Sequence, residues 1–305
     1  MNSNDFEFLR EFLYRRSGLA LTPDKSYLLE SRLAPIARKM KLRTLADLVA
    51  HMRKGTDQLL TTEIVEAMTT NETLFFRDRW PFERFTAIIL PTLMERNAAT
   101  RRVRIWCAAC SSGQEPYSLA MLLAEAGARL AGWQIEIIAT DISDEMLERC
   151  RKGWYSTFEV QRGMPPDLLK KYFTKDGEGW LISEKLRGMV KFRNFNLLQE
   201  PSTAGITGLD LIFCRNVLIY FDEATRKRVF AGMAKVMKPG GYLCLGGAET
   251  VIGISDAFRI LPGERGLFGV SAAASGAQAA PAAASPAPKP AAGAAPLAAP
   301  AIARR

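Results

Sequence analysis

The 305-residue sequence has one histidine, His51, and five cysteines, and this shortage restricts its chemistry. Ser-His and Cys-His catalysis and most zinc hydrolase sites need a histidine beside the reacting group. Cys107 and Cys110 have the C-x-x-C spacing of redox and zinc sites, but no second such pair occurs. Three of the five cysteines lie in apolar runs, where a thiol behaves as a small hydrophobic group. We therefore expect no metal site.

Long hydrophobic runs are also missing, since none approaches the roughly 18–20 residues that span a bilayer. The N-terminus is polar and acidic, without the features of a signal peptide. The 48% apolar and 24% charged content is typical of a soluble globular protein with one large or two smaller domains. These features predict a cytoplasmic protein that does not insert into membranes.

Acidic residues are scarce in residues 25–54, which hold eight Lys or Arg against two acids in a chain of net charge +9. A locally basic face indicates an acidic partner, which could be nucleic acid, anionic lipid or protein. The alternative is an ordinary solvated helix face. The cations that follow Glu30 without an intervening acid are Arg32, Arg38, Lys39, Lys41 and Arg43.

Apolar residues recur at helical spacing through residues 1–68, which predicts a helical domain over 1–70. Gly18 marks the end of the first helix, and Thr22-Pro23 the start of the second. Residues 69–80 mix large apolar side chains with Asn71, Thr73 and Arg77, so they form either a capped helix start or the wall of a site. A further helix is predicted from about Pro81 to Glu95.

A strand, a turn of small residues and a helix are predicted over residues 103–124, with the turn at 109–113. This unit presents backbone N–H groups to a nucleotide-like ligand, although an ordinary α/β turn has the same pattern. The next strand, Gln134 to Thr140, ends at Asp141, which could accept both ribose hydroxyls. Alternatively Asp141 caps the following helix, a role that Ser143 fills equally well.

Residues 153–195 interrupt the α/β alternation and predict a small inserted β unit. Within it, the runs 180–182 and 189–192 are expected to be antiparallel strands. Buried strands at 209–213 and 242–246 enclose a helix from Asp222 to Met237, and a hairpin closes the domain at 258–270. Residues 271–305 are mostly Ala and Pro, a composition that predicts disorder.

Five sequence runs resemble the motifs of the chemotaxis receptor methyltransferase (CheR) family, in the family's order and spacing. The resemblance implies an α/β fold: a class I, Rossmann-like methyltransferase domain over 71–270 with a small antiparallel β insert, preceded by an all-α domain. The runs are T-T-N-E-T-L-F-F-R (69–77), W-C-A-A-C-S-S-G-Q-E-P-Y-S (106–118), A-T-D-I-S (139–143), F-N-L-L (195–198) and L-I-F-C-R-N-V-L-I-Y-F (211–221).

The resemblance implies a cofactor, S-adenosylmethionine, with S-adenosylhomocysteine as its product. It places Arg77 and Tyr220 near the transferred methyl group. The residues it places in contact with the cofactor are Asn71, Thr73, Arg77, Glu115, Asp141, Asn196, Leu197, Arg215 and Asn216. The usual G-x-G-x-G cofactor turn of the wider class reads A-x-S-S-G here, which a cofactor without pyrophosphate tolerates.

The implied reaction is methylation of glutamate side chains on chemoreceptors for sensory adaptation, by a protein-glutamate O-methyltransferase. It needs no general base, because a glutamate of pKa ~4.3 is already ionised at neutral pH. The basic second helix is the family's proposed receptor contact, and in some members the β insert binds a receptor C-terminal pentapeptide.

Two other functions remain open from the sequence. A nucleic-acid methyltransferase fits the positive charge, but the D/N-P-P-Y/F turn of amino-methylating enzymes is replaced by C-R-N-V-L-I-Y, so we expect no nucleic-acid partner. The second open function is that of a non-catalytic module that binds S-adenosylmethionine or a receptor. Arg77 could instead pair with Glu72 or Asp78 at the surface, and Tyr220 could pack beside Phe221.

Overall fold

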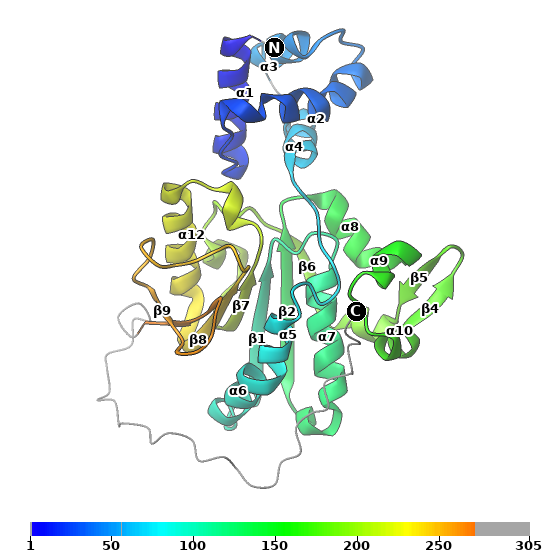
Figure 1. Ribbon diagram of the computed structural model, residues 1–305, viewed down its shortest axis with the longest axis vertical. Coiled ribbons are helices and arrows are strands. Elements are labelled where there is room, and N and C mark those ends of the chain that lie inside the picture. Colours follow the sequence, from blue (N-terminus) through cyan, green and yellow to red (C-terminus); the bar gives the residue numbers. More distant parts are fainter. Residues whose placement is uncertain (1, 56, 272–305) are drawn as a thin grey trace.

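The computed structural model describes residues 2–55 and 57–271, where a helical N-terminal domain stands above an α/β domain (Figure 1). Of the tail predicted to be disordered, residues 272–305 lie outside the described residues. Among the residues described, no helix is both long and apolar enough to cross a bilayer.

The N-terminal domain is all helical, as the periodicity predicts. Its core is built from leucines of several helices, including Leu9, Leu13, Leu29 and Leu48. Gly18 ends the first helix in a left-handed conformation with φ 78°. Thr22 precedes a short 3-10 turn that leads into the second helix, and its side chain makes no capping hydrogen bond. The elements are α1 (Ser3–Ser17), η1 (Pro23–Lys25), α2 (Ser26–Lys39), α3 (Leu45–Arg53) and α4 (Gln58–Met68).

The helix predicted from about Pro81 to Glu95 is present but contains a wider π turn. Its parts are α5 (Trp80–Arg84), the π segment η2 (Phe85–Ile89) and α6 (Leu90–Arg96). The π segment ends two residues before Pro91, which has no N–H and crowds the preceding turn, so a local change of helix type is expected there.

A seven-stranded sheet forms the centre of the α/β domain, in the order β6-β2-β1-β7-β8-β10-β9. The first five strands are parallel, and β10 and β9 form the predicted antiparallel hairpin. This mixed order is that of a class I methyltransferase and confirms the predicted fold class. The strands are β1 (Arg102–Ala108), β2 (Gln134–Asp141), β6 (Val190–Asn194), β7 (Leu209–Cys214), β8 (Met237–Leu245), β9 (Phe258–Ile260) and β10 (Leu267–Val270).

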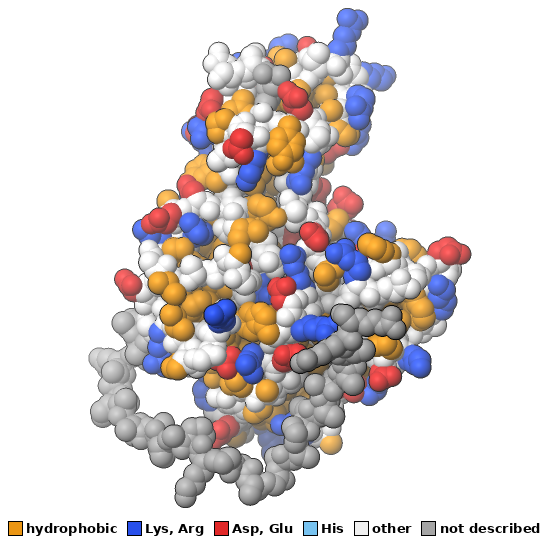
Figure 2. Space-filling view, viewed as in Figure 1, with side chains coloured by type: hydrophobic (Ala, Val, Ile, Leu, Met, Phe, Trp, Pro, Cys, Tyr) orange, Lys and Arg blue, Asp and Glu red, His pale blue; other side chains and the backbone are white. Residues whose placement is uncertain are grey.

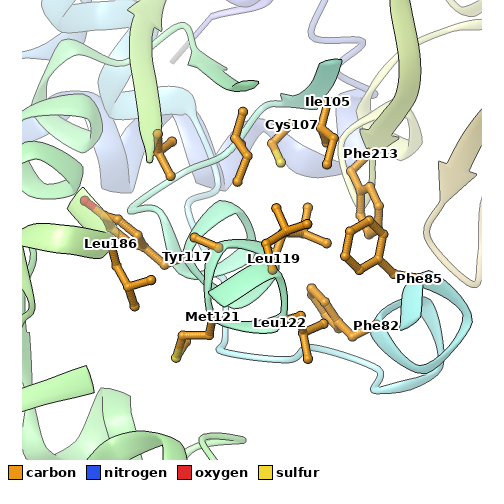
Figure 3. Packing of buried hydrophobic residues seen from close by; sticks show 14 of the residues in the cluster. Phe82, Phe85, Ile105, Cys107, Tyr117, Leu119, Met121, Leu122, Leu186 and Phe213 are labelled. Carbon is orange, nitrogen blue, oxygen red and sulfur yellow. The ribbon is translucent and has the colours of Figure 1, made fainter. Parts of the chain in front are cut away.

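Helices cover both faces of this sheet, because alternate residues of each buried strand point to opposite sides. On one face, Phe82, Phe85, Leu119, Leu122 and Phe213 pack in one layer (Figure 3). The other face carries Trp106, Ile212 and Phe230. The helices and turns that flank the sheet are α7 (Gln114–Ala126), η3 (Gly127–Leu130), α8 (Asp144–Lys152), η4 (Pro201–Ala204), η5 (Leu218–Tyr220) and α12 (Glu223–Val236).

The predicted antiparallel insert is confirmed, but its pairing and its end differ from the prediction. It is a three-stranded sheet of order β3-β5-β4. The run 180–182 belongs to the central strand β5, which pairs antiparallel with β3 and with β4. The run expected at 189–192 instead belongs to β6, which pairs parallel to β2 in the main sheet. The insert therefore ends before Val190 rather than at 195. Its elements are β3 (Trp154–Ser156), α9 (Thr157–Gln161), α10 (Pro166–Tyr172), β4 (Phe173–Asp176), β5 (Gly179–Ile182) and α11 (Glu184–Gly188).

Hydrogen bonds fix the N-terminal domain to the carboxyl edge of the main sheet. The Tyr14 hydroxyl donates to Asp222 over 2.9 Å, and the Ala20 N–H donates to the Tyr220 carbonyl over 2.9 Å. The Asn196 amide donates to the Arg16 carbonyl over 2.6 Å. The end of α1 is thus held against two loops that follow sheet strands.

Gly163 permits a close contact between the insert and the segment that carries Arg77. Its φ is 90°, and a Cβ there would lie 2.2 Å from the Phe75 carbonyl oxygen. We expect Gly163→Ala to lower the free energy of unfolding by about 1–2 kcal/mol for the left-handed conformation and by about 1–3 more for the overlap.

The matched control is Gly253→Ala, because Gly253 has φ 72° and open space around a Cβ. Urea denaturation measures both variants. Equal losses would show that the contact with Phe75 contributes nothing.

Candidate functional site

A cavity of about 1060 Å³, including its open mouth, lies between the two domains. It sits at the carboxyl ends of β1, β2 and β7, where the strand order reverses direction. Parallel α/β sheets bind their ligands at this switch point. Ser17, Leu19, Val65 and Met68 of the N-terminal domain also line the cavity. Sequence patterns gave no signal for these four, because their place depends on how the domains pack.

The structure brings all the predicted site residues to this one cavity. They come from the linker after α4, from α7, from the end of β2 and from the loops after β6 and β7. Their contacts with a cofactor remain a prediction. They are Asn71, Thr73, Arg77, Glu115, Asp141, Asn196, Leu197, Arg215, Asn216 and Tyr220.

The small-residue turn after β1 has the backbone of a glycine-rich turn although it has only one glycine. Ala109, Ser111 and Gly113 have φ of 59°, 49° and 93°. Left-handed backbone costs a residue other than glycine roughly 1–2 kcal/mol. The Ser111 hydroxyl donates to the Asn71 carbonyl over 2.9 Å, and the Tyr155 hydroxyl donates to the Ser112 carbonyl over 2.8 Å. These contacts hold the strained turn in place.

Asp141 binds the same turn and does not cap the following helix. Its Oδ2 accepts the Ser111 N–H over 2.7 Å, and its Oδ1 accepts the Ser143 N–H over 3.0 Å. The helix is capped by Ser143, as the alternative prediction allowed. Burial raises the pKa of Asp141, although these N–H donors oppose the shift. Each carboxylate oxygen can still accept a second hydrogen bond, for example from a ribose hydroxyl.

Arg215 connects three walls of the cavity, and its side chain is only 2% exposed. Its guanidinium donates to Glu115 over 2.9 Å, to Asp78 over 2.6 Å and to the Arg77 carbonyl over 3.0 Å. Burial raises the pKa of Glu115 even though Arg215 opposes the shift. Within the described chain, the buried Arg215 Nε has no hydrogen-bond partner, which leaves a donor for a ligand.

Arg77 lies half-buried on the cavity wall, in a segment with unusual backbone. Its neighbours Phe76 and Asp78 have φ of 52° and 66°. The Arg77 guanidinium donates to the Glu72 carbonyl over 2.8 Å. The carboxylates of Asp78 and Glu72, the expected surface partners, pair with Arg215 and Arg162.

Glu249 holds the loop that carries Tyr220, and no local sequence signal pointed to it. Its Oε2 accepts the N–H groups of Asn216 and Gly246, both over 2.8 Å. Its Oε1 accepts those of Val217 and Leu218 over 2.9 and 2.7 Å. One buried carboxylate thus joins the loops after β7 and β8.

The chemistry of the cavity suits a cationic nucleoside that also carries an amino acid. Carboxylates at Asp141 and Glu115 suit hydroxyl and ammonium groups, and guanidiniums at Arg77 and Arg215 suit a carboxylate. Leu19, Val65, Met68, Ile142 and Phe195 provide apolar surface for a base.

No group of three or more His, Cys, Asp or Glu side chains in residues 2–55 and 57–271 could hold a metal ion. All five cysteines are buried free thiols. Cys110, the second cysteine of the C-x-x-C pair, has its pKa raised by burial, which makes it a poor nucleophile and metal ligand.

Comparison with protein-family models gives two matches that together cover most of the chain. Residues 71–267 match the CheR methyltransferase, SAM binding domain, and residues 4–69 match the CheR methyltransferase, all-alpha domain. The chain belongs to the CheR methyltransferase family. The cofactor of its α/β domain is therefore S-adenosylmethionine, which the cavity's side chains fit.

Curated CheR relatives resemble this chain over nearly their whole length. Chemotaxis protein methyltransferase Cher2 of Pseudomonas putida is 39% identical over 84% of this chain and 94% of its own. Chemotaxis protein methyltransferase 1 of Pseudomonas aeruginosa is 40% identical with the same coverage. The Vibrio parahaemolyticus chemotaxis protein methyltransferase is 40% identical over 86% of this chain and 94% of its own.

Replacing Glu249 by glutamine tests its role in holding the two loops. An amide NH₂ would face two N–H donors, and each unsatisfied buried donor costs about 1–3 kcal/mol. We expect Glu249→Gln to lower the free energy of unfolding by about 2–4 kcal/mol and to weaken S-adenosylhomocysteine binding.

The control is Glu148→Gln, which alters an exposed carboxylate paired with Arg151. Urea denaturation and calorimetry follow both variants. If the two variants behave alike, Glu249 does not hold the loops.

Proposed function

We propose that this protein transfers a methyl group from S-adenosylmethionine to glutamate side chains of chemoreceptors and forms methyl esters. The observation that carries the proposal is that Arg77, Asp141 and Tyr220 line one cavity in a CheR-family chain. The names of the curated relatives, all chemotaxis protein methyltransferases, support a receptor substrate.

The cofactor supplies an electrophilic methyl group on a sulfonium. Asp141 accepts hydroxyls of its ribose, and Glu115 and Arg215 bind its amino-acid end. Asn71, Thr73, Asn196, Leu197 and Asn216 complete the cofactor site. No side chain has to remove a proton, because the attacking glutamate is already ionised near neutral pH.

Arg77 orients the incoming carboxylate, and Tyr220 stabilises positive charge through its ring or hydroxyl. Charge is neutralised as the methyl group transfers, so a site with little water favours the reaction. Leu19, Val65 and Met68 of the N-terminal domain help to exclude that water. Positioning of the two reactants then accounts for much of the rate, up to roughly 7–11 kcal/mol.

Residues 1–70 form the receptor-docking domain in this proposal, and residues 71–270 the catalytic domain. Lys and Arg side chains gather at the far end of the N-terminal domain in Figure 2. Arg38, Lys41 and Arg43 are exposed, and in this proposal they form the docking surface. Lys39 pairs with Glu63 over 2.9 Å. Arg32 serves the fold instead, since it donates to the carbonyls of Met68 and Thr69.

The β insert is the proposed second receptor contact. β3 and β4 are the edge strands of its sheet, and an extended receptor C-terminal peptide could add to either edge. The cytoplasmic location expected from the sequence is part of the same proposal, because receptor signalling regions and the cofactor must meet there.

The function is tested with purified protein, chemoreceptor membranes and methyl-labelled S-adenosylmethionine. We expect label on the receptor that mild base releases as methanol. Label that resists base would contradict glutamate methylation. Binding of the cofactor without any methyl transfer would favour a non-catalytic module, and label in added DNA or RNA would favour a nucleic-acid methyltransferase.

Arg77→Ala tests the positioning of the carboxylate. We expect kcat/KM for the receptor to fall at least about 100-fold, which corresponds to about 3 kcal/mol of transition-state stabilisation. The control is Arg79→Ala, since Arg79 is an exposed arginine two residues away. Wild-type methylation together with wild-type cofactor binding by Arg77→Ala would show that the assignment is wrong.

A further inference from the structure

Strained backbone lies on both sides of Arg77, the residue that orients the substrate carboxylate in the proposed function. Phe76 has a left-handed φ of 52°, Asp78 one of 66° and Arg79 one of 51°. Residues other than glycine avoid this conformation, and it persists only where the surrounding structure imposes it. The groups that impose it on the neighbours of Arg77 therefore also determine where Arg77 lies.

A serine of helix α7 holds the N–H of Phe76. This N–H donates to Ser118 Oγ over 3.0 Å, and the Ser118 hydroxyl donates to the Gln114 carbonyl over 2.7 Å. Because the hydroxyl hydrogen is used within the helix, the oxygen is oriented to accept the Phe76 N–H. Ser118 is 0% exposed, so water does not replace it as the acceptor.

The carbonyl end of the same peptide group is confined by the β insert. The Phe75 carbonyl oxygen lies where a Cβ on Gly163 would be only 2.2 Å away, so it packs directly against the backbone of that glycine. Rotation of the peptide group between residues 75 and 76 would bring φ of Phe76 to negative values without moving either phenyl ring. Ser118 on one side and Gly163 on the other oppose this rotation.

The peptide group that follows Arg77 is fixed as well. The Arg77 carbonyl accepts a hydrogen bond from the Arg215 guanidinium over 3.0 Å. Glu115, which lines the cavity, precedes Ser118 by three residues and lies on the same face of α7. One turn of α7 thus relates the position of Arg77 to the wall that binds the cofactor.

We propose that Ser118 is a positioning residue, which holds the peptide group between residues 75 and 76 in the orientation that places Arg77 on the cavity wall. The inference rests on the proposed function, in which Arg77 orients the substrate carboxylate. Ser118 is not among the residues that line the cavity, so it acts through Arg77 without touching either reactant. Loss of its oxygen leaves the Phe76 N–H without an acceptor, which favours rotation of the peptide group and displaces Arg77.

The test introduces Ser118→Ala into the wild-type chain and into the Arg77→Ala variant, and measures receptor methylation. In the wild-type chain, we expect kcat/KM for the receptor to fall about tenfold, and the S-adenosylhomocysteine Kd from calorimetry to stay within about twofold. In the Arg77→Ala variant, we expect Ser118→Ala to lower kcat/KM by no more than about twofold further. Two residues that act through one another have effects that do not add, whereas a general loss of stability would lower both chains equally.

The matched control is Thr92→Val. The Thr92 hydroxyl also donates to a carbonyl four residues earlier in its helix, that of Ile88, over 2.8 Å, but Thr92 is exposed and is not among the cavity-lining residues. We expect this variant to methylate the receptor at the wild-type rate.

Three outcomes would overturn the role of Ser118. They are a kcat/KM equal to that of the Thr92 control, an undiminished effect in the Arg77→Ala variant, and a rise in the S-adenosylhomocysteine Kd as large as the loss of activity. Wild-type methylation by Arg77→Ala alone would instead contradict the proposed function, so the two failures are distinguishable.

Gly163→Ala gives an independent measurement from the other end of the peptide group. We expect it to lower kcat/KM about tenfold in the wild-type chain and by no more than about twofold in the Arg77→Ala variant, with Gly253→Ala as the control. This variant decides the question if Ser118→Ala no longer binds S-adenosylhomocysteine. An equal loss of activity with and without Arg77 would show that the peptide group does not position the arginine.

Discussion

The buried guanidinium of Arg215 is the interaction on which the cavity depends. It joins the loop after β7 to Glu115 on α7 and to the segment of Arg77 and Asp78, three parts of the chain far apart in sequence. A buried ion pair gains little net stability after desolvation, but loss of one partner leaves a costly uncompensated charge. The main effect of the Arg215 guanidinium is therefore to fix how the walls of the cavity meet, and its net contribution to the stability of the fold is smaller.

Backbone strain in the turn after β1, which forms one wall of the cavity, is balanced by contacts from other parts of the chain. Ala109 and Ser111 have a left-handed backbone at two positions where the cofactor turn of the wider methyltransferase class reads glycine. Asn71, Asp141 and Tyr155 each hydrogen-bond to this turn or to its neighbour Ser112. Tyr155 comes from the insert, and its ring packs against Phe75 with centroids 4.9 Å apart. The insert is thus part of the support for the cofactor site as well as an appended surface.

Local periodicity predicted the main strands and the helical domain, whereas the resemblance to the family implied the site residues, all of which line the cavity. The partner of β6 could not be predicted, since a short run such as V-K-F-R pairs equally well in a parallel or an antiparallel sheet. Glu249 was missed because its four donors lie in two loops. The cavity-lining Leu19 and Val65, and the structural role of Arg32, depend on packing between elements. Such long-range contacts leave no local periodic pattern.

The shared construction of the cavity restricts how such a protein can be recombined. Ser17 and Leu19 belong to the first domain yet face the same space as Tyr220 and Asn196. A helical domain transplanted from a relative would bring cavity-lining side chains that are matched to a different α/β domain. The hydrogen bonds from Tyr14, Ala20 and Asn196 across the junction would have to be matched as well. Evolutionary exchange between relatives should therefore carry both halves together, as one inherited unit.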